Sequence, residues 1–290
     1  MLETCITDLS KLPHASDHEN SVLDLRSNAS DDWGQRPTTV STEIPRRLHQ
    51  TWKGCASPER QRKWQETCRG HNPAWELLHW TDEGNWQLVA RDFPDFLKTF
   101  DGYDAVIKRV DAIRYMLMYR FGGVYMDLDF ACLRPFDQLP LLLPPGRAVL
   151  GVGMPPDVLS ITSRFGRTAN QHPWSNAFIA APPRHPFFAF VVRRLVAAAK
   201  QRSVLKATGP RMLSAAVRQW QRMNGDVSAD GSGSGLSLQP FGTIYNHDGL
   251  QRSGTSHPCG NGTASELPAC AERFPRSFAT TFWTATWIRP

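Results

Sequence analysis

Apolar and polar positions alternate in blocks along most of the chain, so that short apolar runs are separated by longer amphipathic stretches. The apolar runs predict strands within 44–54, 75–80, 124–133, 147–153, 176–181 and 236–245. The amphipathic stretches predict helices near 57–69, 82–98, 104–120, 186–201 and 209–222. Strands that alternate with helices are typical of the α/β class, in which helices cover a central sheet.

The amino-terminal part of the chain does not share this pattern. Residues 1–42 are rich in Ser, Asp, Asn and Thr and show little periodicity, which predicts a flexible leader. We therefore expect one folded domain over 43–290, with surface loops at 224–235 and 249–268, where Gly, Ser and Pro gather.

The helix expected at 104–120 carries both an apolar face and a pair of opposite charges. Its predicted apolar face consists of Val106, Val110, Ile113 and Leu117. Asp111 and Arg114 lie together on another face, so both could contact a common ligand, although an exposed ion pair would look the same in sequence. "FGG" at 121–123 ends the helix, and its glycines could also let the backbone approach a ligand.

An acidic pair follows the apolar start of the strand expected at 124–133. Asp127 and Asp129 are two residues apart, so their side chains would point to the same side of an extended strand, at a sheet edge where α/β proteins bind ligands. Carboxylates are the oxygen ligands that Mg²⁺ and Mn²⁺ prefer. Such triplets are also common in solvated turns, so the spacing alone is weak evidence for a metal site.

The surrounding sequence makes the acidic pair more specific. "KRVDAIRYMLMYRFGGVYMDLDFACLRPFDQL" at 108–139 resembles the signature of the family 32 glycosyltransferases, the D-x-D family that includes fungal Golgi mannosyltransferases. Weaker matches follow the family's order at "IPRRLHQTW" (44–52), "NPAWELLHWTD" (72–82), "NAFIAAPPRHPFF" (176–188) and "TGP" (208–210). The resemblance covers roughly residues 44–287.

The resemblance implies a GT-A type nucleotide-sugar-binding fold over 43–290, with a mixed central sheet flanked by helices. It implies transfer of a hexose with retention, from a UDP- or GDP-sugar to a glycan or glycolipid acceptor, with Mn²⁺ or Mg²⁺ as cofactor. Asp111, Arg114, Asp127 and Asp129 match its catalytic positions, and Asp127 and Asp129 its metal ligands.

The resemblance also implies which residues bind the nucleotide sugar: Trp52, Asp111, Arg114, Asp127 and Asn176. Trp52 falls where relatives place an aromatic ring against the base, and stacking on an indole tolerates either nucleotide. The sequence leaves two alternatives open, because Trp52 fits a core aromatic and Asn176 fits a strand-edge residue equally well.

The carboxyl-terminal segment "TTFWTATW" departs from the family. Many members have two histidines before the first of two tryptophans, whereas this chain has Thr281 and Phe282 there and retains Trp283 and Trp287. One metal or phosphate ligand is therefore in doubt, and we expect this tail to close over the donor.

The amino-acid composition limits the classes of binding partner that we expect. The 33 basic and 27 acidic residues give a net charge of +6 and a pI near 9.1, which suits an anionic substrate. The basic residues form no clustered stripe, so a nucleic-acid partner is not expected. No signal peptide or apolar stretch of membrane-spanning length is visible, so membrane association would need an anchor outside this sequence or a partner.

The six cysteines leave the compartment open. Their spacing suggests local disulfides Cys55–Cys68 and Cys259–Cys270, and acceptor sequons for glycosylation begin at Asn28 and Asn261. These features fit the Golgi or secretory pathway that the resemblance implies, although buried free thiols and chance sequons would also explain them.

Two other functions remain as alternatives. One is a catalytically impaired sugar-binding module, which the missing histidines suggest. The other is a haloacid-dehalogenase-type phosphatase, in which the first Asp of D-x-D is the nucleophile. That class usually has Thr or Val after the second Asp, and Phe130 stands there.

Overall fold

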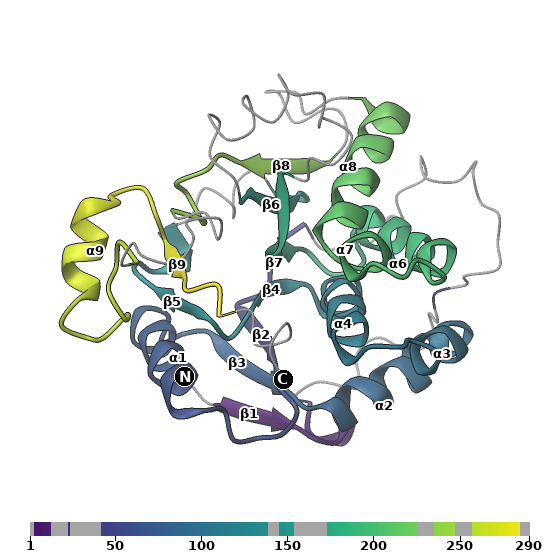
Figure 1. Cartoon of the computed structure of the whole chain (residues 1–290), viewed down its shortest axis with the longest axis horizontal. Coiled ribbons are helices and arrows are strands. Elements are labelled where there is room, and N and C mark those ends of the chain that lie inside the picture. The colour runs from purple at the N-terminus through teal and green to yellow at the C-terminus, as the bar shows by residue number, and fades with distance from the viewer. Residues whose placement is uncertain are drawn as a thin grey trace.

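The computed structural model describes residues 3–12, 23, 42–138, 145–153, 173–225, 235–246 and 257–284. Seven strands form a central sheet in the order β1-β3-β2-β4-β7-β6-β8 (Figure 1). Their bounds are β1 (Glu3–Ile6), β2 (Arg47–Thr51), β3 (Glu76–Trp80), β4 (Gly123–Met126), β6 (Ala148–Val152), β7 (Trp174–Ala181) and β8 (Leu236–Gln239). A separate two-stranded ladder joins β5 (Phe130–Cys132) to β9 (Ala279–Thr281).

Strand β7 runs opposite to its two neighbours in the sheet, β4 and β6. The pairs β1·β3, β2·β3 and β2·β4 are parallel, whereas β4·β7 and β6·β7 are antiparallel and β6·β8 is parallel again. The carboxyl end of β4 therefore meets the carboxyl end of β2 and the beginning of β7. Open α/β sheets bind ligands outside the carboxyl ends of their strands, which makes this edge the first place to look for a site.

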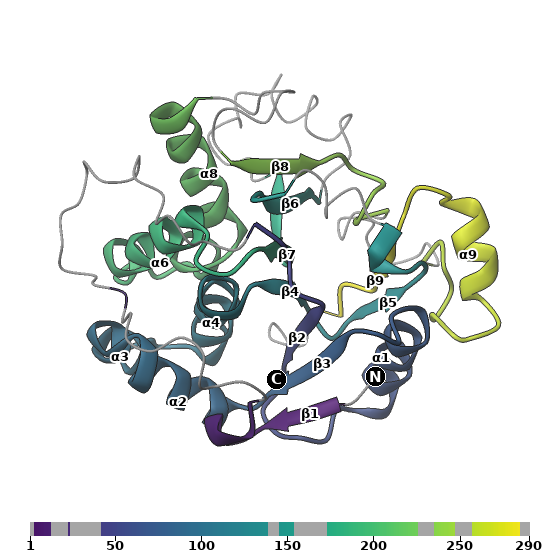
Figure 2. The same cartoon turned by 180° about the vertical axis from the view of Figure 1, so that it is seen from behind.

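Helices cover one side of the sheet. That layer contains α2 (Asp82–Asp92), α3 (Pro94–Asp101), α4 (Val106–Phe121), α6 (Pro186–Ala198), α7 (Val204–Ala207) and α8 (Pro210–Asn224). The other side carries α1 (Glu59–His71), the β5·β9 ladder and α9 (Leu267–Arg273), as the opposite view in Figure 2 also shows. Two short 3₁₀ turns, η1 (Leu9–Lys11) and η2 (Phe136–Gln138), complete the described elements. The predicted α/β class, with a mixed sheet flanked by helices, is confirmed.

Each side of the sheet has its own apolar core. Ile113, Leu117, Ile179 and Leu213 belong to the cluster under the helical layer, and Leu48, Val124 and Phe178 to the cluster under α1 and the β5·β9 ladder. Neighbouring strand residues such as Phe178 and Ile179 fall in different clusters, because successive side chains of a strand point to opposite faces.

Part of the predicted flexible leader is a strand. Residues Glu3–Ile6 form β1, the edge strand of the sheet, paired in parallel with β3. A disulfide between Cys5 and Cys55 fastens β1 to the segment after β2. The prediction does not hold for residues 3–12, because composition does not reveal pairing with a distant strand. Apart from Leu23, residues 13–41 lie outside the described part of the chain.

Two predicted elements are divided. The helix expected at 82–98 ends at Asp92 and resumes as α3 at Pro94, whose ring removes a backbone donor and restricts Phe93 to a non-helical conformation. The strand expected at 124–133 becomes β4 and β5, which belong to different sheets. The link between them contains both members of the acidic pair.

The predicted apolar face of α4 is only partly right. Ile113 and Leu117 are buried, but Val106 is 57% exposed at the start of the helix. The charged face is buried as well, because α4 lies between the sheet and other helices, with all residues from Asp111 to Met118 buried. The alternative of an exposed Asp111–Arg114 ion pair is therefore wrong.

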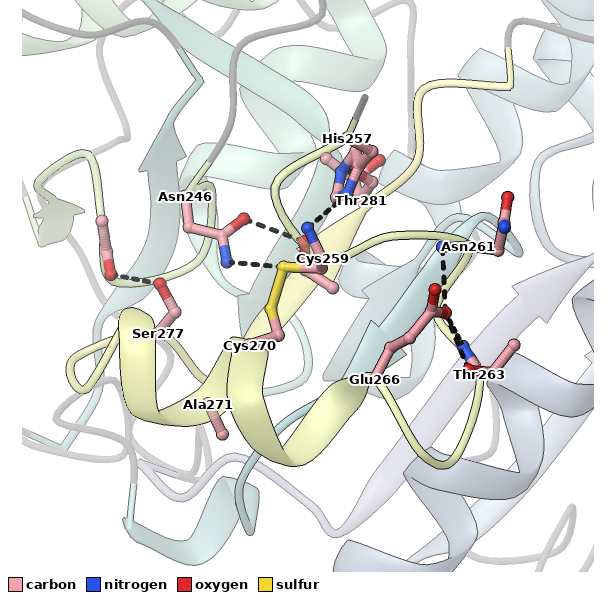
Figure 3. The surroundings of a disulfide bond; sticks show 12 residues. Asn246, His257, Cys259, Asn261, Thr263, Glu266, Cys270, Ala271, Ser277 and Thr281 are labelled. Carbon is pink, nitrogen blue, oxygen red and sulfur yellow. Dashed lines mark hydrogen bonds between the residues drawn. A yellow bond between two sulfur atoms is a disulfide. The ribbon is translucent and has the colours of Figure 1, made fainter. Parts of the chain in front are cut away.

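The cysteines form three disulfides: Cys5–Cys55, Cys68–Cys132 and Cys259–Cys270. The predicted Cys259–Cys270 bond is confirmed, and Figure 3 shows it joining the loop after His257 to α9. The predicted Cys55–Cys68 bond is wrong, because each of these residues pairs with a cysteine brought close by the fold rather than by sequence. Asn261 is exposed, while Asn28 lies outside the described residues.

Among the described residues, no helix has the length and hydropathy needed to cross a membrane.

Candidate active site

The turn between α4 and β4 depends on two glycines. Gly122 and Gly123 have positive φ angles of 63° and 90°, which few other residues adopt. A Cβ atom at Gly122 would lie 2.5 Å from Pro183 N, and one at Gly123 would lie 2.6 Å from Arg47 O. These glycines allow close packing of the chain between α4 and the sheet, so packing explains them without a ligand.

A buried ion pair on α4, between Asp111 and Arg114, lies beneath the accessible part of the site. Arg114 Nη2 lies 2.9 Å from Asp111 Oδ1, and both side chains are almost fully buried. Asp111 also accepts hydrogen bonds from Asn176 Nδ2 at 2.9 Å and from Thr208 Oγ1 at 3.0 Å. Burial nevertheless raises the pKa of Asp111, a shift opposed by the positive charge of Arg114.

Arg114 also connects Asp111 to Asp127, the first residue of the acidic pair. Its Nη1 group lies 3.1 Å from Asp127 Oδ1 and donates to the backbone oxygen of Asn176 at 2.8 Å. Burial alone would lower the pKa of Arg114, but the negative charges of Asp127 and Asp111 raise it above its ordinary value. Among the described residues, its Nε has no hydrogen-bond partner. Arg114 is therefore a permanent cation fixed between two carboxylates.

Asp127 lies at the end of β4 and is the accessible carboxylate of this network. Its backbone N–H donates to Ala177 O at 2.9 Å, and Tyr125 OH donates to its Oδ1 at 2.9 Å. The side chain of Asp127 is 32% exposed. Within the described parts of the chain, the other oxygen, Oδ2, has no hydrogen-bond partner. Asp127 is thus held rigidly by one oxygen while the second remains available to a ligand.

Asp129 has a different environment, because residues 127–129 form a link rather than an extended strand. Its Oδ2 accepts from the backbone N–H of Thr284 at 2.9 Å and from Thr284 Oγ1 at 3.2 Å, while Thr281 Oγ1 is 3.4 Å from Oδ1. Partial burial and the charge of Asp127 raise the pKa of Asp129 to about 6. The expected extended strand is therefore absent at this pair, although the charge of Asp127 still acts on Asp129.

The carboxyl-terminal tail therefore reaches the site through Asp129. Phe282, at a family histidine position, donates its backbone N–H to Asp129 O at 2.8 Å and stacks its ring on Trp64 at 4.3 Å. Trp283 stacks on Tyr245, with ring centroids 5.9 Å apart. Trp287 lies outside the described residues, so the predicted closing flap remains a prediction.

The structure brings four predicted site residues into one network, namely Asp111, Arg114, Asp127 and Asn176. Asn176 is buried, and its amide is already bonded to Asp111, which favours a positioning role over direct contact with sugar hydroxyls. Trp52 follows β2 and is partly buried rather than part of the core. The hydroxyl of its neighbour Thr51 lies 3.1 Å from Tyr125 OH, so Trp52 is close in sequence to the network.

Three further residues of the site were not predicted. Tyr125 lies two positions before Asp127, so strand periodicity could have placed it on the same face. Thr208 begins the "TGP" segment, whose resemblance to the family was noted without a role for the hydroxyl. No local signal points to Thr284, because its contact with Asp129 joins residues 155 positions apart.

The oxygen ligands here suit a hard divalent cation in part. Asp127 has an available oxygen, whereas both oxygens of Asp129 accept hydrogen bonds from the tail. The described residues contain no group of three His, Cys, Asp or Glu side chains placed to hold a metal. The donor set thus fits a cation held by one or two carboxylates and completed by substrate phosphates and water, as Mg²⁺ usually is.

Comparison with known proteins supports a glycosyltransferase. Residues 58–141 match the family model described as "Glycosyltransferase sugar-binding region containing DXD motif". The chain is 33% identical over 188 residues to inositol phosphoceramide mannosyltransferase 3 of Schizosaccharomyces pombe, covering 63% of this chain and 47% of that protein. It is 30% identical over 245 residues to mannosyl phosphorylinositol ceramide synthase CSH1 of Saccharomyces cerevisiae, covering 83% and 57%.

Solved structures resemble the chain more distantly. The PaToxG glycosyltransferase aligns with a TM-score of 0.43 and 17% identity, over 62% of this chain and 70% of that one. The UDP-bound glycosyltransferase domain from the YGT toxin aligns with a TM-score of 0.44 and 9% identity, over 68% and 80%.

The sheet, the acidic network at its edge and the family match are together typical of the sugar-binding region of glycosyltransferases. Residues 58–141 match the DXD-containing sugar-binding family, and the chain is similar to fungal mannosyltransferases, which confirms the resemblance predicted from sequence. The chain spans about half the length of the curated relatives it matches.

Proposed function

We propose that this protein is a retaining, metal-dependent hexosyltransferase that moves mannose from a UDP- or GDP-sugar to a glycolipid acceptor. The observation that carries the proposal is the buried Asp111–Arg114–Asp127 network, which ends on a partly exposed carboxylate at the carboxyl end of β4. Retention rests on the family resemblance alone. The choice of mannose follows the names of the relatives, which are mannosyltransferases.

In this proposal, Asp127 and Asp129 contact the cation, and the network behind them fixes their positions. A bound divalent cation supplies positive charge that stabilises the departing nucleotide diphosphate. Arg114 holds Asp127 Oδ1, and Asp111 holds Arg114, so the available oxygen of Asp127 needs little rearrangement to bind. Because both oxygens of Asp129 are bonded to the tail, its contribution requires exchange of Thr281 or Thr284 contacts for the ion.

Trp52 is assigned to the nucleotide base. It follows β2 at the edge where Asp127 emerges, and its partly buried side chain leaves ring surface for stacking. Loss of a base stack weakens binding by about 1–3 kcal/mol. Trp52→Ala is therefore expected to raise the dissociation constant for UDP or GDP about tenfold. Unchanged affinity for both nucleotides would remove Trp52 from the site.

The acceptor and compartment follow from the same relatives. Two of them carry inositol phosphoceramide or mannosyl phosphorylinositol ceramide in their names, so we infer a phosphoinositol-containing sphingolipid as acceptor. Three disulfides suit an oxidising compartment, which agrees with a Golgi or secretory location.

The direct test is to incubate the protein with UDP- or GDP-mannose, detergent-solubilised inositol phosphoceramide and Mn²⁺, with and without a chelator. Mass spectrometry would detect the mannosylated lipid, and NMR would give its anomeric configuration. Metal-dependent product with the donor's configuration supports the proposal. Binding of nucleotide sugar without any turnover would favour the impaired module, and hydrolysis of phosphate monoesters alone would favour the phosphatase.

A further inference from the structure

One segment of the helical layer has an unbalanced charge. Residues 173–225 contain no Asp or Glu, although Arg and Lys occur throughout them. Lys200, Arg202 and Lys206 are exposed and lie around the turn that joins α6 to α7. We call these three residues the basic rim.

Apolar side chains accompany the rim. Val204 and Leu205, between Arg202 and Lys206, are only partly buried. Val106 is 57% exposed at the start of α4. The same end of α4 is fastened to the rim, because Lys108 Nζ donates to Gln201 O at 2.9 Å.

The rim has one acidic neighbour that the contacts identify. Asp104 Oδ1 lies 2.7 Å from Lys108 Nζ, so its charge is paired with a lysine that is not part of the rim. The basic rim therefore keeps its positive charge, next to half-exposed aliphatic side chains. This mixture is the composition by which protein surfaces bind anionic lipid headgroups and the first methylenes beneath them.

The rim adjoins the proposed active site through the chain itself. α7 leads into Thr208, whose hydroxyl donates to Asp111 and whose carbonyl accepts from Tyr115 OH at 2.8 Å. A Cβ atom at Gly209 would lie 3.0 Å from Leu205 Cα and 3.4 Å from Asp111 Oδ2, so α7 packs tightly against the network. Figure 1 shows α7 beside α4 in the helical layer.

From this arrangement we infer that the basic rim docks the enzyme on an anionic membrane surface, so that a lipid acceptor reaches the network whose accessible carboxylate is Asp127. The inference deepens the proposed function and rests on its lipid acceptor. Docking by the rim uses long-range attraction that acts within a Debye length of about 10 Å at 0.1 M salt. It places the reaction next to the bilayer without any membrane-crossing segment among the described residues.

The test measures co-sedimentation of the 290-residue chain with phosphatidylcholine vesicles, with and without phosphatidylserine, in the absence of nucleotide sugar. Each Lys or Arg near an anionic membrane contributes about fivefold in binding. Replacing Lys200, Arg202 and Lys206 together by Gln is expected to weaken binding to the phosphatidylserine vesicles by about a hundredfold or more.

A matched control changes the net charge equally. Arg60, Arg62 and Lys63 are exposed on α1, on the other side of the sheet, and two of them already pair with Glu on their own helix. The Gln variant of these three is expected to bind the same vesicles within a few fold of the parent chain. Thermal unfolding of both variants shows whether either has lost its fold.

The outcomes separate this inference from the proposed function. Equal binding to both kinds of vesicle, or equal losses in the two variants, would overturn the inference, as would selective binding to a soluble polyanion such as heparin but not to vesicles. If the rim fails this test while mannose is still transferred to detergent-solubilised lipid, the proposed function stands alone. If vesicles bind through the rim but no sugar is transferred, the proposed function fails instead.

Discussion

Helices α1 and α4 both carry opposite charges at helical spacing, yet the fold treats them differently. On α1, Lys63 pairs with Glu59 at 2.8 Å and Arg62 with Glu66 at 3.8 Å, with all four side chains more than half exposed. On α4, Asp111 and Arg114 pair at 2.9 Å with side-chain exposures of 7% and 3%.

The difference shows that an ion pair affects the stability of the fold mainly where it is buried. Water screens the α1 pairs and replaces them readily, so each contributes little. In α4 the charges have left water, and each must be compensated by the other and by Asp127, Asn176 and Thr208. Removing one member of this buried set therefore leaves the remaining charges without compensation.

The largest expected effect comes from breaking the buried set. Arg114→Met leaves Asp111 and Asp127 without their cation, and loss of one partner of a buried pair typically costs about 3–5 kcal/mol. Urea unfolding monitored by circular dichroism measures this loss. Arg114→Lys retains the charge and should recover part of the stability. A loss below about 1 kcal/mol in Arg114→Met would show that water reaches the network.

The next effect concerns chemistry rather than stability. Asp127→Asn keeps the shape of the side chain but removes the charge at its exposed end, which should lower turnover about 10²–10³-fold. Donor turnover with saturating Mn²⁺ measures it, and the unfolding temperature should fall less than in Arg114→Met, because Asp111 still pairs with Arg114 and the amide oxygen still accepts from Tyr125. Activity close to that of the parent chain would exclude Asp127 as a ligand of the ion.

A buried histidine extends the comparison to pH. Burial lowers the pKa of His49 to about 3, and the neutral ring bridges Gly122 O and Trp80 Nε1. Because the folded pKa lies below the unfolded value of about 6.5, its stabilisation is complete above pH 6.5 and is lost as the pH falls toward 3. Near pH 5 the loss should reach about 2 kcal/mol.

The measurement compares urea unfolding of the parent chain and of His49→Gln near pH 7 and near pH 5. Gln cannot titrate, so the variant should lose less stability between the two pH values. An identical pH dependence in the two proteins would mean that His49 is protonated without opening the core.

The smallest effect is expected on α1. Arg62→Met removes a side chain of the same type as Arg114→Met does, but its ion pair with Glu66 is exposed. The free energy of unfolding should change by less than about 0.5 kcal/mol. A loss comparable to that of Arg114→Met would contradict the view that burial, rather than pairing, separates the two helices.

The sequence alone determined the alternation of strands and helices, the acidic pair and the resemblance to the DXD-containing sugar-binding family. Apolar residues recur at the spacing of a helix or strand wherever one face of the element is buried. The sequence therefore predicted α1, β3, β7 and α8 close to their observed bounds. Asp111, Arg114, Asp127 and Asn176 are four of the six site residues that the family resemblance implied, the others being Trp52 and Asp129. The network in the structure joins the same four residues.

Only the tertiary structure decided which of these groups are buried and what holds them. β5 pairs with β9 instead of continuing β4, so the acidic pair lies in the link between the two strands, where Asp129 binds Thr284 and Asp127 binds Arg114. Cys5 meets Cys55 from 50 residues away, and Asp111 meets Thr208 from 97 residues away. Such contacts leave no local pattern in the sequence, because they arise when separate elements pack around a common core.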